Sequence, residues 1–287
     1  MNNHSWLDRT AYPFKSQFFP HADGRIHYLD EGQGEAVVMV HGTPTWSFMY
    51  RHLISSLSAQ YRVIAPDHLG FGLSDKPKQV DYSVQAQALR FESWLDSLAL
   101  PSLHLVVHDF GGPIALAYAL KYPHKIKSLT IANTWMWSAR GEAQFEKMAK
   151  TLASPLLPFL YRWLNFSARF LIPQGFAQRK QLSRAVHRQY LAPFAFGERE
   201  APLAFARSLL EAQDWFASLW EQRQNLKDIR TQILWGSQDR FLDTGYAERF
   251  ASIWPEAARI IRFDKAGHFL WEEAHQEILP IITQFIK

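Results

Sequence analysis

The fold of this chain is decided by the stretch Leu103-His104-Leu105-Val106-Val107-His108-Asp109-Phe110-Gly111-Gly112-Pro113. An apolar, β-branched run ends there at a polar pair, and two glycines follow. Residues 115–120 then have the composition of a helix. The stretch therefore predicts a strand, a sharp turn with Asp109 at its apex, and a helix. An aspartate in this place is also a common cap of the helix that would begin near Gly112.

Length and composition describe one folded core that carries an insertion. The chain has 287 residues, of which 47% are hydrophobic and 15% aromatic, with 11 Trp and 21 Phe. This composition suffices for a large core and suggests a cavity lined by aromatic side chains. The net charge of +4 is mild, and no dense block of Lys and Arg predicts nucleic-acid binding. The chain has no cysteine, which excludes disulfide and thiol chemistry.

The sequence predicts neither a targeting segment nor a membrane span. Residues 1–8 lack the basic and apolar regions of a signal peptide. The most apolar long segment, residues 155–173, is interrupted by Arg162, Asn165 and Arg169. We therefore expect a cytoplasmic protein, a monomer or homodimer, that acts on a small apolar organic substrate with water and needs no cofactor or metal.

Strand and helix patterns alternate along the chain, which predicts an α/β fold with a mostly parallel central sheet flanked by helices. Between residues 137 and 226 the pattern is helical only, and five prolines break it. We expect this block, 137–226, to be a helical cap inserted into one core that comprises residues 1–136 and 227–287. The expected strands are residues 16–20, 25–30, 36–40, 62–65, 103–107, 126–132, 231–235 and 258–263, and the expected helices are 47–57, 82–98, 115–120, 245–253 and 269–286.

Three polar residues each follow a strand of the predicted sheet. Asp109 ends one strand, Asp239 follows residues 231–235, and His268 follows residues 258–263. Because parallel strands present their carboxyl ends at the same edge, we expect the three side chains to converge. Asp239 alone is a common turn former, and His268 alone is a common helix cap. Together they favour a catalytic site over three unrelated structural roles.

The residue types indicate a two-step reaction. The carboxylate of Asp109 is ionised at neutral pH and can attack a saturated carbon that carries a leaving group, which forms an ester. His268 can then act as general base on a water that attacks the ester. Asp239 would orient the imidazole of His268 and stabilise its cation.

Several motifs resemble those of haloalkane dehalogenases, enzymes of the α/β-hydrolase fold, and the resemblance covers nearly the whole predicted core. Asp109 stands at the nucleophile position of their elbow, G-x-nucleophile-x-G, although Val107 replaces the first glycine. The motifs are His41-Gly42-Thr43-Pro44-Thr45-Trp46-Ser47-Phe48, Pro66-Asp67-His68-Leu69-Gly70-Phe71-Gly72, Val107-His108-Asp109 and Ala266-Gly267-His268-Phe269.

The resemblance implies an α/β-hydrolase fold and roles for further residues. It implies that the backbone N–H groups of Thr43 and Phe110 form the oxyanion hole. One branch of the family places the catalytic acid after an earlier strand, which ends here at Ala132-Asn133-Thr134. No carboxylate stands there, so the chain matches the branch that uses the position of Asp239.

Two departures from the family concern the leaving group. The family usually has a tryptophan directly after the nucleophile, whose indole N–H binds the departing halide, and this chain has Phe110. Thr43 stands where many members have asparagine. We expect the substrate and leaving-group pocket to include Trp46, Trp137, Trp163 and Tyr190. Trp137 and Trp163 are candidates for the missing donor, although a tryptophan in a helical cap is more often a packing residue.

Three alternatives stay open beside a haloalkane dehalogenase-like hydrolase. An epoxide hydrolase would use the same three residues and polarise the ring oxygen with cap tyrosines, for which Tyr161 and Tyr190 are available. A relative that processes β-lactones is a second alternative. A non-catalytic ligand-binding protein on a hydrolase fold is the third.

Overall fold

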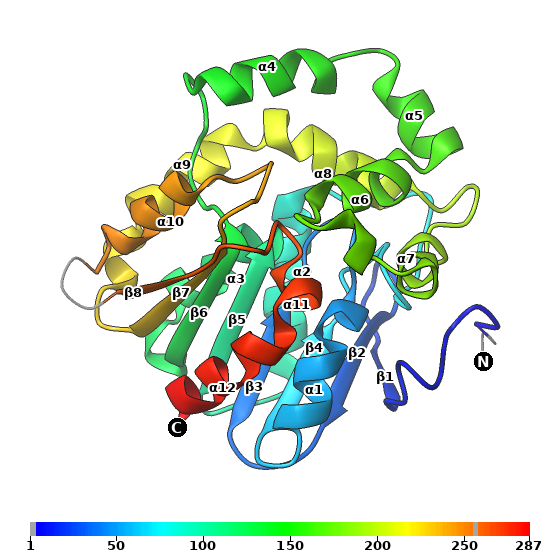
Figure 1. Ribbon diagram of the computed structural model, residues 1–287. Helices are drawn as coiled ribbons and strands as arrows, with labels where there is room; N and C mark the ends of the chain where they lie inside the picture. Colours follow the sequence, from blue (N-terminus) through cyan, green and yellow to red (C-terminus); the bar gives the residue numbers. More distant parts are fainter. Residues whose placement is uncertain (1–3, 255–257) are drawn as a thin grey trace.

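A computed structural model describes residues 4–254 and 258–287 of the chain, and its centre is a twisted sheet of eight strands (Figure 1). No targeting signal is expected in residues 1–8, and the first three of these residues lie outside the described part of the chain. The strand order is β1-β2-β4-β3-β5-β6-β7-β8. β1 and β2 run antiparallel to their neighbours, and the remaining strands are parallel. The strands are β1 (Ser16–Phe19), β2 (Ile26–Glu31), β3 (Ala36–Val40), β4 (Arg62–Pro66), β5 (Leu103–Asp109), β6 (Ile126–Thr134), β7 (Arg230–Gly236) and β8 (Arg259–Phe263).

The strand prediction is confirmed, with every boundary within two residues of the expected one. β3 and β5 lie side by side in the middle of the sheet, and every residue of both is buried. A strand covered on both faces must be apolar along its whole length, which explains the continuous runs in the sequence.

Helices cover both faces of the sheet. α1 packs against α12, and α2 packs against α3 on the other side (Figure 1). The single helices expected at 47–57 and 269–286 are each divided, the first into a 3₁₀ turn and α1, the second into α11 and α12 at Ala274. The helices of the core are α1 (Arg51–Leu57), α2 (Val84–Ser97), α3 (Gly111–Lys121), α10 (Thr244–Ala251), α11 (Leu270–Glu273) and α12 (His275–Ile286), with 3₁₀ turns at Ser47–Tyr50 and Pro123–Lys125.

α3 begins at Gly111, four residues before the expected start at residue 115. Glycine carries no side chain that would show the helical pattern, so Gly111 and Gly112 concealed the first turn. Pro113 fits this turn because the first N–H groups of a helix have no partner within it.

The chain between β6 and β7 contains only helices and turns, and no strand interrupts the described residues there. Figure 1 shows α4, α5 and α8 above the sheet. The division into a cap, 137–226, and a core stays a prediction. No helix in the described part of the chain combines the length and apolarity that crossing a bilayer requires. The inserted helices are α4 (Ala143–Leu152), α5 (Leu157–Leu164), a π-helical turn (Ser167–Leu171), α6 (Ile172–Gly175), α7 (Arg184–Leu191), α8 (Glu200–Glu211) and α9 (Gln213–Glu221), with 3₁₀ turns at Arg179–Gln181 and Arg223–Leu226.

Candidate active site

Asp109 lies at a strained turn between β5 and α3. Its φ is +50°, a left-handed conformation that costs a non-glycine residue about 1–2 kcal/mol. The turn is held from behind by Thr134, whose hydroxyl donates to the Asp109 carbonyl oxygen at 2.5 Å. Gly111 lets the first turn of α3 approach the backbone of β3 at Val40, where a side chain would collide. The strain is therefore maintained by surrounding contacts, and it directs the carboxylate away from the strand end.

The carboxylate of Asp109 is held by the loop that follows β3. Its Oδ1 accepts a hydrogen bond from the backbone N–H of Thr43 at 2.7 Å. The backbone N–H of Phe110 also interacts with the carboxylate and lowers its pKa. Gly42 lies so close that a Cβ there would overlap the Asp109 side chain. The Thr43 N–H, one of the two donors expected for an oxyanion hole, thus points at this carboxylate.

His268 connects the two predicted acids. Its Nδ1 lies 2.7 Å from Asp239 Oδ2, and its Nε2 lies 3.4 Å from Asp109 Oδ2. Because the carboxylate of Asp239 can only accept, Nδ1 is the donor and Nε2 faces Asp109. The remaining oxygen of Asp239 accepts from the backbone N–H groups of Phe241 and Leu242 at 2.7 and 3.1 Å. The structure therefore brings Asp109, Asp239 and His268 together, all three buried.

Asn133, at the end of β6, is a member of this network that the sequence did not reveal. Its side-chain N–H donates to Asp239 Oδ2 at 2.7 Å, and its Oδ1 accepts from the Gly236 backbone at 2.9 Å. Its φ of +33° is one that asparagine tolerates better than most residues. The one indication in the sequence is the position of Asn133, at which another branch of the family has the catalytic acid.

His108 supports His268 without approaching the cavity. It is buried, and its Nε2 donates to the His268 carbonyl oxygen at 2.8 Å. Burial and the neighbouring His268 lower the pKa of His108 to about 3, so the ring is neutral. The backbone N–H of His268 donates to the Gly175 carbonyl oxygen of α6, also at 2.8 Å. His268 is thus anchored to the sheet and to the inserted helices.

Charge distribution favours an imidazolium between two carboxylates. Burial lowers the pKa of His268, but the carboxylates of Asp239 and Asp109 raise it more strongly, to about 10. Burial raises the pKa of Asp109, but the hydrogen bond and charge of His268 outweigh this effect and lower it below its usual range. Asp109 is therefore ionised at neutral pH.

An apolar cavity of about 400 Å³ lies between this group and the inserted helices. Asp109, His268 and Thr43 contribute its polar end. α4 and α5 contribute much of the opposite wall, where the side chains are almost all apolar. This wall includes Phe145, Met148, Leu152, Leu157, Tyr161 and Phe166.

The structure does not bring the four expected pocket residues into this cavity. Trp46 is buried under the N-terminal segment, where its indole N–H donates to the Gln189 carbonyl oxygen at 3.0 Å. Trp137 fills the space against Trp220 and Phe250, with ring centroids 5.1 and 4.9 Å away. Both indoles are therefore packing residues.

The other two expected residues also point elsewhere. Trp163 is exposed on the outer face of α5. The hydroxyl of Tyr190 donates to Glu272, which forms a buried ion pair with Arg51. Among the described residues, the tryptophan and tyrosines that line the cavity instead are Trp135, Tyr161 and Tyr246. Short helices broken by proline give too little periodicity to predict which face turns inward.

Few polar groups in the cavity beside Asp109 are available to stabilise a leaving group. The Phe110 ring offers no donor and packs against Trp135 and Phe205, with centroids 4.8 and 4.7 Å away. The Thr43 hydroxyl is buried and has no hydrogen-bond partner among the described residues. Burial, followed by the charge of Asp109, raises the pKa of the Tyr161 hydroxyl above its usual value.

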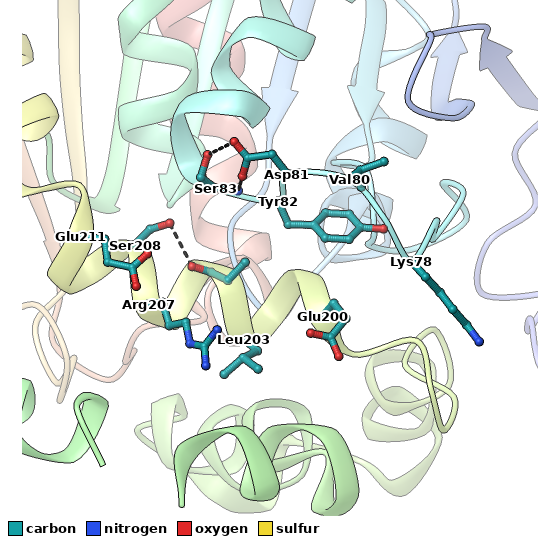
Figure 2. Close-up of a pocket in the computed structure, with 11 residues that line it drawn as sticks. Lys78, Val80, Asp81, Tyr82, Ser83, Glu200, Leu203, Arg207, Ser208 and Glu211 are labelled. Atoms are coloured by element: carbon teal, nitrogen blue, oxygen red, sulfur yellow. Dashed lines mark hydrogen bonds between the residues drawn. The ribbon is translucent and has the colours of Figure 1, made fainter. Parts of the chain in front are cut away.

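A second, polar groove of about 210 Å³ lies between residues 78–83 and α8 (Figure 2). Two of its serines are engaged in hydrogen bonds: the Ser83 hydroxyl donates to Asp81 at 2.9 Å, and the Ser208 hydroxyl accepts from the Val84 backbone at 3.2 Å. None of the predicted site residues lines it. We therefore assign the candidate site to the apolar cavity.

Comparisons with known proteins identify the family of the chain. The profile of the family described as alpha/beta hydrolase fold matches residues 35–274. "Haloalkane dehalogenase 2" of Mycobacterium tuberculosis is 32% identical over 279 residues, which cover 96% of both chains. "Cis-3-alkyl-4-alkyloxetan-2-one decarboxylase" of Shewanella oneidensis is 34% identical over 291 residues, which cover 96% of this chain and 90% of that protein.

Solved structures show the same fold. The haloalkane dehalogenase DbeA of Bradyrhizobium elkani superposes with a TM-score of 0.83 over 95% of this chain and 97% of its own. At 21% identity, this likeness concerns the fold alone.

Proposed function

The chain belongs to the α/β-hydrolase family and is a haloalkane dehalogenase-like hydrolase, and on this basis we propose that Asp109 is its nucleophile. The observation that carries the proposal is the position of the Asp109 carboxylate. One oxygen is held by the Thr43 N–H, the other faces His268, and both belong to the wall of an apolar cavity. A serine-type hydrolase would need a hydroxyl in this place.

In the first step, Asp109 Oδ2 attacks a saturated carbon of the substrate and displaces the leaving group with its electron pair. Oδ1 stays with its backbone donors and becomes the carbonyl oxygen of the ester. No base is needed, because the lowered pKa of Asp109 keeps the nucleophile ionised. The apolar cavity removes water from the carboxylate and holds the reacting carbon beside it.

In the second step, water hydrolyses the ester. Esterification removes the charge of Asp109, one of the two charges that raise the pKa of His268. The imidazole then becomes neutral more readily and can accept a proton from water, while Asp239 stabilises the cation that forms. The N–H groups of Thr43 and Phe110 stabilise the tetrahedral oxyanion on Oδ1.

The substrate class that the cavity fits is a small apolar molecule with a leaving group on a saturated carbon. A halide is the first candidate, because of the identity to the Mycobacterium dehalogenase. An oxygen leaving group is the second, and the site itself favours it. Phe110 supplies no halide donor, whereas Thr43 and Tyr161, which line the cavity, each carry a hydroxyl that can donate to a departing oxygen.

Among substrates with an oxygen leaving group, the comparisons support a β-lactone. The Shewanella relative is named for an oxetan-2-one, which is a four-membered lactone with alkyl substituents. Attack of Asp109 on the ring carbon that bears oxygen would open the ring, and the oxygen would leave as a carboxylate. An epoxide is the third candidate, for which Tyr161 is the available cap tyrosine.

The inserted helices, residues 137–226, act in this proposal as the cap that selects the substrate. α4 and α5 would exclude water and read the length of its apolar chain, since their side chains form the wall opposite Asp109. The oligomeric state and a cytoplasmic location stay predictions.

The proposal is tested by incubating the protein at neutral pH with bromoalkanes, β-lactones and epoxides. Released halide and product mass are measured, with Asp109→Ala as the control. Turnover of one class by the unmodified protein and none by Asp109→Ala supports the proposal. Equal turnover by both proteins would contradict it.

A further inference from the structure

The outer surface of α5 and the segments beside it is unusually apolar. Six of the nine large apolar side chains that are exposed in the described residues lie between residues 156 and 196. Phe159, Trp163 and Phe196 are 52%, 59% and 66% exposed. We call this surface the aromatic patch, and its members are Leu156, Phe159, Trp163, Leu164, Phe170 and Phe196.

Three aromatic rings of the patch lie together, and most of the patch rests on α5, a helix that is apolar on both faces. The Trp163 ring lies 5.0 Å from Phe196 and 6.3 Å from Phe159, measured between centroids. Leu157 and Tyr161, on the other face of α5, line the cavity. A helix that is apolar all round is normally covered on all sides. A cluster of exposed aromatic residues therefore marks a surface with a partner.

The charge of the surrounding chain indicates which partner. Residues 147–197 contain eight Lys and Arg and no Asp or Glu, whereas the whole chain has 31 basic and 27 acidic residues. All eight are exposed, and among the described residues only Arg162 forms an ion pair, with Glu200. The eight are Lys147, Lys150, Arg162, Arg169, Arg179, Lys180, Arg184 and Arg188.

Cations also lie directly beside the aromatic rings. The Arg199 guanidinium is 5.9 Å from the centre of the Phe196 ring. Burial lowers the pKa of Arg199, and the positive charge of nearby Arg169 lowers it further. Arg169 itself adjoins Phe170 in the chain. Glu198 and Glu200 are the acidic residues near this group, and Glu200 is engaged by Arg162.

We propose that the aromatic patch docks on the surface of an anionic lipid bilayer. Aromatic rings with arginines between them match the interface, where rings enter the boundary of the acyl chains and cations contact lipid phosphates. A second copy of this chain fits less well. A symmetric contact would bring two surfaces together that carry cations without matching carboxylates.

Docking here would bring the cavity close to the bilayer. Met148 is exposed and also lines the cavity, and α5 separates the patch from the cavity by the thickness of one helix. Apolar molecules concentrate in bilayers, so the protein would meet its substrate where that substrate is most abundant. The docking itself needs no catalysis, and it can therefore be tested apart from the proposed function.

Flotation with lipid vesicles tests the proposal, without substrate and with the full chain. Vesicles of phosphatidylcholine with about 30 mol% phosphatidylglycerol are compared with pure phosphatidylcholine. The double variant Phe159→Ser/Trp163→Ser is compared with Leu89→Ser, which removes an exposed apolar residue from α2. Equal thermal midpoints by circular dichroism establish that both variants are folded.

We expect the unmodified protein and Leu89→Ser to float with anionic vesicles and to remain unbound with neutral ones. The double variant should bind roughly tenfold more weakly or not at all. Arg169→Gln should bind about fivefold more weakly, an effect that salt reduces. The proposal would be overturned if the unmodified protein floated with neither kind of vesicle. It would also be overturned if the double variant bound anionic vesicles as strongly as the unmodified protein. The unmodified protein could instead form a dimer and bind no vesicles. If that dimer dissociates in the double variant but not in Leu89→Ser, the patch is the interface with a second copy.

Discussion

The side-chain amide of Asn133 donates a hydrogen bond to Asp239 Oδ2, the oxygen that also accepts from His268. The amide thereby fixes the carboxylate that orients the imidazole. A carboxylate held by neutral donors keeps its charge available to stabilise His268 as a cation. This relationship predicts that Asn133 acts on the hydrolytic step, in which His268 must gain a proton.

Asn133→Gly should therefore slow ester hydrolysis about tenfold, since a hydrogen bond to a charged group is worth ~1.5–3 kcal/mol. Glycine keeps the backbone conformation at φ +33°, which alanine would strain. Rapid-quench measurement should show hydrolysis slowed and the alkylation rate unchanged. A variant with both rates unaltered would show that Asn133 has only a structural role.

Phe110→Trp should increase halide release. Phe110, the residue after Asp109, carries no indole donor, so we expect weak turnover of chloroalkanes and better turnover of bromoalkanes, whose leaving group needs less stabilisation. Ion chromatography of released halide measures both. Phe110→Leu is the control, because it alters packing against Trp135 and Phe205 without adding a donor. Efficient chloroalkane turnover by the unmodified protein would show that another group binds the halide.

Tyr161→Phe separates an oxygen leaving group from a halide. If the Tyr161 hydroxyl stabilises a departing oxygen, its loss should slow the opening of β-lactones or epoxides by about 10²-fold, with a smaller effect on bromoalkanes. Tyr246→Phe is the matched control, since Tyr246 also lines the cavity but its hydroxyl is bonded to Glu142. Equal losses in the two variants would remove Tyr161 from the leaving-group step.

The two chemical steps should respond differently to pH. The lowered pKa of Asp109 keeps it ionised, so single-turnover alkylation should be constant from about pH 9 down to about pH 4, near the ordinary pKa of aspartate. Hydrolysis needs neutral His268, and its rate should fall as the pH drops below the pKa of that histidine in the ester. The two rates are measured by quench-flow across this range. Parallel profiles would indicate one shared titrating group.

Much of this arrangement follows from the sequence, for a physical reason. Strands β3 and β5 are buried on both faces, so their residues must be apolar, and the polar residues at their ends stand out. The three residues Asp109, Asp239 and His268 could be found because parallel strands end at one edge. The sequence predicts a start for helix α3 that is four residues too late, because Gly111 and Gly112 have no side chains that could show the helical pattern.

The interior of the cavity could not be predicted in the same way. Trp137 and Trp163 were expected in it, but Trp137 packs against α9 and α10 and Trp163 faces outward. α5 has eight residues, nearly all apolar, so its sequence does not distinguish the inner face of Tyr161 from the outer face of Trp163. Tertiary contacts decide this orientation.

The covalent intermediate tests the central claim most directly. His268→Phe removes the base but leaves the nucleophile and both oxyanion donors in place. General-base catalysis contributes about 10²–10⁴-fold, so the ester should persist long enough to detect. Intact-mass measurement after mixing with a substrate from the screen should show one adduct, and peptide mapping should place it on Asp109. Asp109→Ala/His268→Phe, the matched control, should show none. An adduct on another residue, or normal turnover by His268→Phe without an adduct, would contradict the account.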